Sequence, residues 1–325
     1  MRILLCGTNY GSSYLRALFS NESGLRLAGI LARSERSRAM AAQCDVPFYA
    51  GVDELPADVV DAACVAISGP SGYAITAALL VRGIHVLAEH PVYAAEVVTH
   101  RDTARQHGAI YHVNAHYSDL ESAATFISAF RAARDRSRLL FINIMSNPRA
   151  LYSAIEIIAR ALGSLRPFTL THVPGDAGSF FHLAQAIVAG APFTFQVQRM
   201  TSEVDDGSAN WVSHNITAGF EEGVLSLGEA AGPVGWFSAP PPLAQLQQGA
   251  EVWGRPLLRV LATPPPTFGD YAGWSRDRAN RIALARFATA IASGDTPPEQ
   301  SDDHLLGVSE LWQAMLDWNG DSINL

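Results

Sequence analysis

The chain has 325 residues, is 48% hydrophobic and carries a formal net charge of −8. It is therefore long enough for one large core or two, and its acidic balance argues against a surface for nucleic acid or anionic membranes. Its three cysteines, Cys6, Cys44 and Cys64, form no CxxC pair, which favours a reducing compartment over a disulfide framework. Because no transmembrane or signal-peptide pattern stands out, we expect a soluble cytoplasmic protein.

The first third of the chain alternates short apolar segments with segments of helical periodicity. Strands are predicted at 2–7, 25–33, 60–68, 84–91 and 109–117, and helices at 12–21, 34–44, 72–83 and 94–108. Strands this apolar, separated by helices, are typical of a parallel sheet that is covered on both faces. We therefore predict an α/β fold whose first domain, residues 1–117, is a doubly wound parallel sheet of the Rossmann kind.

Residues 118–325 show a different order, in which several strand-like segments follow one another. Strands are predicted at 138–146, 167–173, 193–201, 211–221 and 223–230, and helices at 121–135, 151–163, 276–294 and 302–318. The proline-rich segment 238–270 predicts a long surface loop. We expect a second, α+β domain on an open mixed or antiparallel sheet, which binds substrate and forms dimers. The C-terminal helices are free to pack back on the first domain.

The stretch "GTNYGSSY", residues 7–14, lies between the first predicted strand and the first helix. Dinucleotide-binding loops carry glycines at the first, third and sixth positions, which here are Gly7, Asn9 and Ser12. The motif is degraded, but a strand, tight turn and helix start offer free N–H groups to a pyrophosphate. The alternative is an ordinary glycine-rich turn. We predict a cofactor loop made of Gly7, Thr8, Asn9, Tyr10 and Gly11.

The end of the second predicted strand distinguishes NAD from NADP. An acidic residue there would bind ribose hydroxyls, but this chain has Ala32, followed by a basic stretch with a hydroxyl. Guanidinium and hydroxyl groups are the donors that a 2′-phosphate needs. NADPH is therefore favoured over NADH, although a solvated helix start would have the same composition. The predicted contacts are Arg33, Ser34, Arg36 and Arg38, with Ser68 and Glu89 at the ends of the following strands.

A helix followed by "IHVLAEHP", residues 84–91, resembles the glucose–fructose oxidoreductase and inositol dehydrogenase superfamily, whose members carry "AGKHVLCEKP". Glu89 and Pro91 match, while His90 takes the place of the lysine. Sugar-oxidising members also carry Asp-x-Gly-x-His-x-x-Asp before a helix ending in Leu-Gly. By spacing, Ser153 falls at the histidine and Glu156 at the second aspartate. The groups that serve oxidation of a sugar hydroxyl are thus replaced at both places.

One branch of that superfamily is similar to this chain in five patches. They are "GTNYGSSY" at 7–14, "EHP" at 89–91, "VNAHY" at 113–117, "HNITAGFEEGVLSLGEAAGPVGW" at 214–236 and "LLGVSELWQ" at 305–313. The chain thereby resembles the thiazolinyl imine reductases of yersiniabactin- and pyochelin-type siderophore assembly. The resemblance implies NADPH-dependent reduction of a thiazoline C=N bond to a thiazolidine. It also implies a substrate presented by a carrier domain of a nonribosomal peptide synthetase, and a homodimer.

Such a reduction needs a proton for the imine nitrogen, and an unperturbed histidine titrates near the working pH, at about 6.5. We therefore predict His90 and Tyr117 as the proton-donating pair, with His90 also counted among the cofactor contacts. Two alternatives remain: His90 only orients the cofactor, or water supplies the proton. Strand alternation predicts a structural His116, opposite Tyr117.

His214 and Asn114 are predicted to line the substrate pocket, and no spacing indicates a metal site. Two other functions remain open. The protein could be a superfamily oxidoreductase acting on another imine or on a carbonyl group. It could also be a non-catalytic NADP-binding sensor, because a dead paralogue would lose the same lysine and histidine.

Overall fold

The computed structural model describes residues 1–19, 24–175, 178–199, 210–242, 244, 254 and 256–317. The chain divides into two compact units. Among the described residues, unit 1 contains 1–119 and 272–310, and unit 2 contains 120–271 and 311–317. No helix of the described part is long and apolar enough to cross a membrane.

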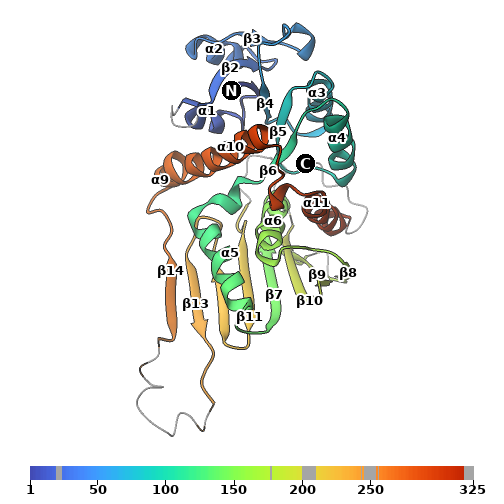
Figure 1. The fold of residues 1–325 in the computed structure, drawn as a ribbon. Coiled ribbons are helices and arrows are strands. Elements are labelled where there is room, and N and C mark those ends of the chain that lie inside the picture. Colours follow the sequence, from blue (N-terminus) through green and yellow to red (C-terminus); the bar gives the residue numbers. More distant parts are fainter. Residues whose placement is uncertain are drawn as a thin grey trace. The chain divides into compact units, whose positions relative to one another are not determined.

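Unit 1 is built on a six-stranded sheet in which all paired strands are parallel (Figure 1). In the order β3-β2-β1-β4-β5-β6, its strands are Phe48–Tyr49, Arg26–Leu31, Arg2–Cys6, Ala62–Val65, His85–Glu89 and Tyr111–Asn114. The connecting helices are α1 Ser12–Phe19, α2 Glu35–Gln43, α3 Gly69–Val81 and α4 Ala94–Gln106. The predicted doubly wound parallel sheet is therefore confirmed.

A late helix completes the core of unit 1. Helix α10, Arg276–Ser293, packs against α1 and buries Leu284 and Phe287 in the cluster that holds the inward side chains of β1 and β4. The strand order also has a consequence for chemistry. Because all six strands run the same way, the carboxyl ends of β1, β2, β4, β5 and β6 meet at one edge of the sheet, where ligands bind in such folds.

Unit 2 carries an eight-stranded mixed, mostly antiparallel sheet, as predicted. In the order β14-β13-β12-β11-β7-β10-β9-β8, its strands are Leu258–Ala262, Val234–Ser238, Gly223–Leu227, Asn215–Phe220, Leu139–Ser146, Ala191–Gln198, Phe181–Val188 and Phe168–Val173. Only β7 and β10 pair in parallel among these strands. The predicted hairpin appears as the antiparallel pair of β11 and β12.

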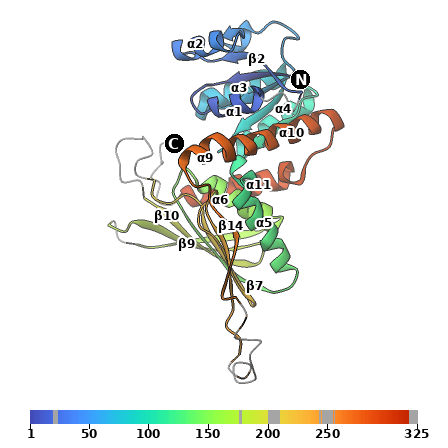
Figure 2. The ribbon, with the colours of Figure 1, turned by 90° about the vertical axis from the view of Figure 1, so that its left-hand side faces the viewer.

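Helices α5, Glu121–Arg134, and α6, Leu151–Leu162, pack side by side and contact the sheet of unit 2, which Figure 2 shows nearly edge-on. Buried and more exposed residues alternate along β7, β9 and β12, as expected for strands of a sheet with one covered face. Ten of the twelve residues of α6 are buried.

Several sequence predictions were wrong in detail. Strands β9 and β13 were missed, and residues 258–262 form strand β14 inside the predicted loop 238–270. Edge strand β14 is exposed along almost its whole length, so it has no burial alternation to detect. The predicted strand 109–117 ends at Asn114, and His116–Asp119 form a 3₁₀ turn. Met200 and Thr201, at the end of another predicted strand, lie outside the described residues.

Candidate functional site

A cavity of about 850 Å³ opens in unit 1 where β1, β2 and β4 end. This size is typical of pockets for cofactors and other small molecules. Its lining includes six of the predicted cofactor residues: Gly7, Thr8, Asn9, Arg33, Ser34 and Ser68. The same lining contains the acidic residue Asp53, which follows β3 in a 3₁₀ turn.

The loop between β1 and α1 requires glycine at its start. Gly7 has a φ of +82°, and an added Cβ would lie 2.6 Å from Cγ1 of Ile67. A side chain there would be strained in its own backbone and would also collide with the segment after β4. The loop can therefore run close to the ends of both strands and present the positive end of α1 to the cavity.

Three hydroxyl groups line up beside this loop. Oγ of Ser37 lies 2.6 Å from Oγ1 of Thr8 and 2.7 Å from Oγ of Ser34, which also caps α2 by accepting a hydrogen bond from the Ser37 amide. The end of β2 carries no acid, because Ala32 is buried there. Helix N-terminus, hydroxyls and Arg33 together fit a dinucleotide of the NAD(P) type.

Two of the predicted arginines do not line this cavity. Arg38 lies over the ring of Phe48 at 4.2 Å and 3.5 Å from a carboxylate oxygen of Glu35. Arg36 is exposed on α2 and is also absent from the lining. The basic stretch therefore offers one arginine to the cavity rather than three.

The remaining predicted cofactor residues lie elsewhere in unit 1. Gly11 is buried, and its Cβ position would overlap the carbonyl of Gly7, so it allows a close approach within the loop. Tyr10, Glu89 and His90 belong to a group of imidazole, phenol and carboxylate side chains, which we call the imidazole–phenol cluster. Its members are Tyr10, Tyr14, Glu89, His90, Asn114, His116 and Tyr117.

Glu89, the last residue of β5, is the anion of this cluster. Its side chain is 9% exposed, and its Oε2 accepts hydrogen bonds from the Tyr14 hydroxyl and from Nδ2 of Asn114. Burial raises the pKa of Glu89, but hydrogen bonds and charge from His116 and His90 outweigh that effect and lower the pKa to about 2. The carboxylate therefore stays ionised at neutral pH.

The two predicted proton donors lie together in this cluster. Nδ1 of His90 is 2.9 Å from the carbonyl oxygen of Asn114, to which it donates as N–H, and 3.1 Å from Oε1 of Glu89. The ring of Tyr117 stands edge-on to the ring of His90, with 5.8 Å between centroids. The His90–Pro91 peptide bond is cis. Their role in catalysis stays a prediction.

His116 does not lie opposite Tyr117, so that prediction was wrong. The chain leaves the extended conformation after Asn114, and the 3₁₀ turn brings the two rings together at a tilt of 30°, with 4.3 Å between centroids. His116 is fully buried, with its Nε2 3.2 Å from the Tyr10 hydroxyl. Burial lowers the pKa of His116, while the hydrogen bond and the charge of the nearby Glu89 carboxylate act in the opposite direction.

Donor atoms of Glu89, His90 and His116 all lie within 4.8 Å of one another, which is close enough for a shared metal ion. In this part of the chain, however, both imidazoles already have hydrogen-bond partners. Nδ1 of His90 faces the Asn114 carbonyl, and Nε2 of His116 faces Tyr10. These contacts orient the two rings beside the carboxylate, an arrangement that is suited to handling a proton.

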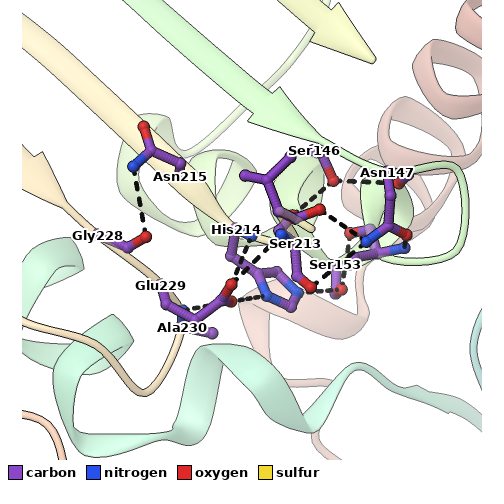
Figure 3. Close-up of polar contacts among 11 residues, drawn as sticks. Ser146, Asn147, Ser153, Ser213, His214, Asn215, Gly228, Glu229 and Ala230 are labelled. Carbon is purple, nitrogen blue, oxygen red and sulfur yellow. Dashed lines mark hydrogen bonds and ion pairs between the residues drawn. The ribbon is translucent and has the colours of Figure 1, made fainter. Parts of the chain in front are cut away.

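Unit 2 contains a second buried imidazole, His214, next to β11 (Figure 3). Its Nε2 lies 2.7 Å from Oγ of Ser153, and its Nδ1 donates to Oε1 of Glu229. Glu229 also accepts the Ala230 amide at 2.9 Å. His214 is 2% exposed and Ser153 is fully buried, so the imidazole is held at both nitrogens.

Two residues at the end of β7 tie this imidazole to α6. Oγ of Ser146 donates to the Ser213 carbonyl at 2.5 Å, and Nδ2 of Asn147 donates to the Val212 carbonyl at 2.7 Å. The Asn147 side-chain oxygen accepts the amides of Arg149 and Ala150 just before α6. The network in Figure 3 therefore fixes the start of β11 against the start of α6.

Sequence reasoning missed Glu229 as the partner of His214. The two residues are 15 positions apart, and only the hairpin of β11 and β12 brings them together. Glu156, which by spacing was expected at the second aspartate of the sugar-oxidising motif, is buried and pairs with Arg160 within α6. Asn114, predicted as a substrate contact, is buried in unit 1 and donates to Glu89 and to Oδ1 of Asn280.

Two families account for most of the chain. Residues 1–115 match the oxidoreductase family with an NAD-binding Rossmann fold. Residues 138–237 match the C-terminal domain of the thiazolinyl imine reductase Irp3-like family. No curated protein matches the chain.

Solved structures with this fold are distant in sequence. An oxidoreductase from Agrobacterium radiobacter in complex with NAD+, L-tartaric acid and magnesium is 12% identical, with a TM-score of 0.72 over 99% of this chain and 96% of that one. GenD2 from gentamicin A biosynthesis, in complex with NAD, is 15% identical, with a TM-score of 0.70 over 99% and 94%. The myo-inositol 2-dehydrogenase of Lactobacillus plantarum is 14% identical, with a TM-score of 0.69 over 98% and 97%. At such identities the likeness shows the fold alone.

The contact between His214 and Glu229 predicts a pH dependence of stability. Burial raises the pKa of Glu229, but hydrogen bonds from His214 and main-chain amides bring it below the ordinary value of 4.5. A carboxyl with a lowered folded pKa stabilises the fold above the unfolded pKa, and this is lost as the pH falls through the folded value.

We therefore expect Glu229→Gln to lower the melting temperature at pH 7 and to flatten its fall below about pH 4.5. Thermal unfolding between pH 3 and 7 measures both effects. Glu222→Gln, an exposed glutamate of the same hairpin, is the matched control and should keep the wild-type profile. Identical profiles for wild type and Glu229→Gln would contradict the assignment.

Proposed function

Because the chain is an oxidoreductase of the NAD-binding Rossmann family with an Irp3-like C-terminal domain, we propose that it is an NADPH-dependent thiazolinyl imine reductase. It reduces the C=N bond of a thiazoline to give a thiazolidine. The observation that carries the proposal is the pairing of His90 with Tyr117 in a chain whose second domain is Irp3-like. The reduced nicotinamide, when bound, supplies the hydride for the imine carbon.

Different residues of the cavity bind different groups of the cofactor. Gly7, Thr8 and Asn9 surround the N-terminal end of α1 and hold the pyrophosphate. Arg33 and Ser34 hold the 2′-phosphate, because they supply a guanidinium and a hydroxyl beside a strand end that lacks an acid. The carboxylate of Asp53 in this cavity repels the 2′-phosphate, so the preference for NADPH depends on the positive charge of Arg33.

The protonation of the imine nitrogen falls to the imidazole–phenol cluster. His90 keeps its Nδ1–H on the Asn114 carbonyl, which leaves Nε2 as the ring nitrogen that takes and gives a proton. Tyr117 is half-buried beside it and carries a phenol proton. Glu89 places a carboxylate oxygen 3.1 Å from Nδ1 of His90.

The natural substrate, in this proposal, is a thiazoline intermediate of siderophore or related nonribosomal peptide synthesis, carried as a thioester on a synthetase carrier domain. The protein acts as a homodimer. These assignments follow from the Irp3-like match and from the five similar sequence patches.

Turnover with a 2-hydroxyphenyl-thiazoline substrate analogue tests the function directly. The purified protein is mixed with NADPH and the analogue, and the absorbance of NADPH is followed, with a ketone and a free acyclic imine in parallel. Faster oxidation with the thiazoline supports the proposal. Faster oxidation with the ketone or the acyclic imine makes the protein a different oxidoreductase. Tight NADPH binding without turnover on any of the three makes it a sensor.

The cofactor preference is tested at Arg33. Hydrogen bonds to charged groups contribute about 1.5–3 kcal/mol, so Arg33→Ala should weaken NADPH binding by roughly 10- to 100-fold and leave NADH binding nearly unchanged. Isothermal titration measures both dissociation constants. Arg36→Ala removes an exposed arginine that does not line the cavity, and it should bind both cofactors like wild type. Equal loss for both cofactors in Arg33→Ala would refute the 2′-phosphate contact.

The proton donors are tested by His90→Gln and Tyr117→Phe at saturating NADPH. A general acid contributes roughly 100- to 10,000-fold to the rate, so kcat should fall by about that factor in the variant that removes it. The rate of wild type should fall as pH rises through the pKa of the donor, and this alkaline limb should disappear with the donor. Water is the proton source if both variants keep near-wild-type rates from acid to alkaline pH. His107→Gln, at the exposed end of α4, serves as the control.

A further inference from the structure

The proposed donors Tyr117 and His90 lie at the two ends of one chain of polar contacts. Tyr117 shares a hydrogen bond with Tyr10, and the Tyr10 hydroxyl lies 3.2 Å from Nε2 of His116. On the far side of the His116 ring, Nδ1 faces Oε1 of Glu89 at 3.5 Å. The same Oε1 is 3.1 Å from Nδ1 of His90.

The middle of this chain of contacts contains two buried acceptor atoms that one shared proton would satisfy. Oε1 of Glu89 and Nδ1 of His116 are both buried, and the neighbours of this oxygen are the Nδ1 atoms of His116 and His90. His116 is 0% and Glu89 9% exposed at the side chain, so solvent does not satisfy these atoms. Two buried acceptors that face one another are costly, whereas a proton between a carboxylate and an imidazole nitrogen satisfies both.

We propose that Glu89 and His116 take up and hold the proton for the reaction, and that Tyr10 passes it to Tyr117. The inference rests on the proposed reduction, because that reaction consumes one proton per turnover. His116 and Tyr10 act through Tyr117 and are therefore positioning residues, with no contact of their own to the substrate.

The transfers balance in protons and bonds. Tyr117 gives its O–H proton to the substrate nitrogen and becomes a phenolate, which then takes the O–H proton of Tyr10. Tyr10 regains a proton from Nε2 of His116, while Nδ1 of His116 binds the proton shared with Glu89. The store refills from the solvent by way of His90. Its Nε2 takes up a proton from water, and its Nδ1 proton, which lies near both the Asn114 carbonyl and Oε1 of Glu89, passes to that carboxylate oxygen.

The groups around Glu89 and His116 favour proton transfer in the direction of Tyr10 and Tyr117. Tyr14 and Asn114 hold the second oxygen of Glu89, and the guanidinium of Arg276 lies 4.8 Å from the ring of Tyr10. Burial raises the pKa of Tyr10 well above 10, so its hydroxyl keeps a proton except during transfer. Burial also raises the pKa of the neighbouring Cys64 thiol, which therefore stays neutral. Arg276 and His90 both lower the pKa of His116, while Glu89 raises it.

Two variants interrupt the chain at different points. His116→Gln keeps hydrogen-bonding groups but cannot take up a proton. Tyr10→Phe leaves the store intact and removes the hydroxyl between it and Tyr117. The matched controls are His112→Gln, a buried imidazole of β6 that packs against Phe287, and Tyr111→Phe on the same strand.

The first measurement needs no substrate. Histidine side-chain NMR of the free protein across pH should show His116 titrating together with His90, as coupled groups around one carboxylate. His116→Gln should remove one titration and shift that of His90, and Glu89→Gln should uncouple the two. Independent titration of His90 in wild type and in both variants would overturn the proton store, whether or not the protein reduces thiazolines.

The second measurement separates the first turnover from later ones. In Tyr10→Phe, Tyr117 still carries its own proton, so the single-turnover rate should stay within about twofold of wild type. Steady-state turnover should fall on the order of tenfold or more, with a larger solvent deuterium isotope effect. A merely structural role would lower both rates together. Equal losses in both, or no loss in either, would overturn the relay, while the controls should match wild type.

Discussion

The buried carboxylate of Glu89 is the constraint around which the end of the unit 1 sheet is organised. A buried anion is stable only when donors compensate it, and here they come from separate segments: Tyr14 from α1, Asn114 from β6, and His90 from the residue after β5. Because each donor must point at one carboxylate, the side chains that could handle a proton are held in fixed positions. The chemistry of the site depends on this arrangement more than on any single imidazole.

The loop between β1 and α1 serves two parts of unit 1 at once. Its first residues line the 850 Å³ cavity, while Tyr10 turns toward His116. A short segment that would hold a phosphate therefore also places a phenol in the imidazole–phenol cluster. A substitution in the loop would therefore affect both the cavity and the imidazole–phenol cluster, so the non-standard sequence of the loop has consequences beyond the loss of two glycines.

Unit 2 holds a polar network of its own between its sheet and its helices. Ser153 of α6 bonds to the imidazole of His214, which lies next to β11. Glu229 holds the other side of the ring. Solved structures that share this fold at 12–15% identity include an oxidoreductase bound to NAD+ and tartaric acid and a myo-inositol dehydrogenase. The fold is thus compatible with several chemistries, and the side chains decide among them.

The sequence by itself determined the elements whose signal is local. Apolar runs indicated β1, β4 and β5, helical periodicity indicated α5 and α10, and Gly7 indicated the turn of the predicted phosphate loop. It could not show the exposed edge strand β14, because burial alternation is absent there. Only the tertiary structure placed His116 against Glu89 and His214 against Glu229. Those contacts depend on where β6 ends and on how β11 pairs with β12, and neither is encoded in the spacing of the residues that meet.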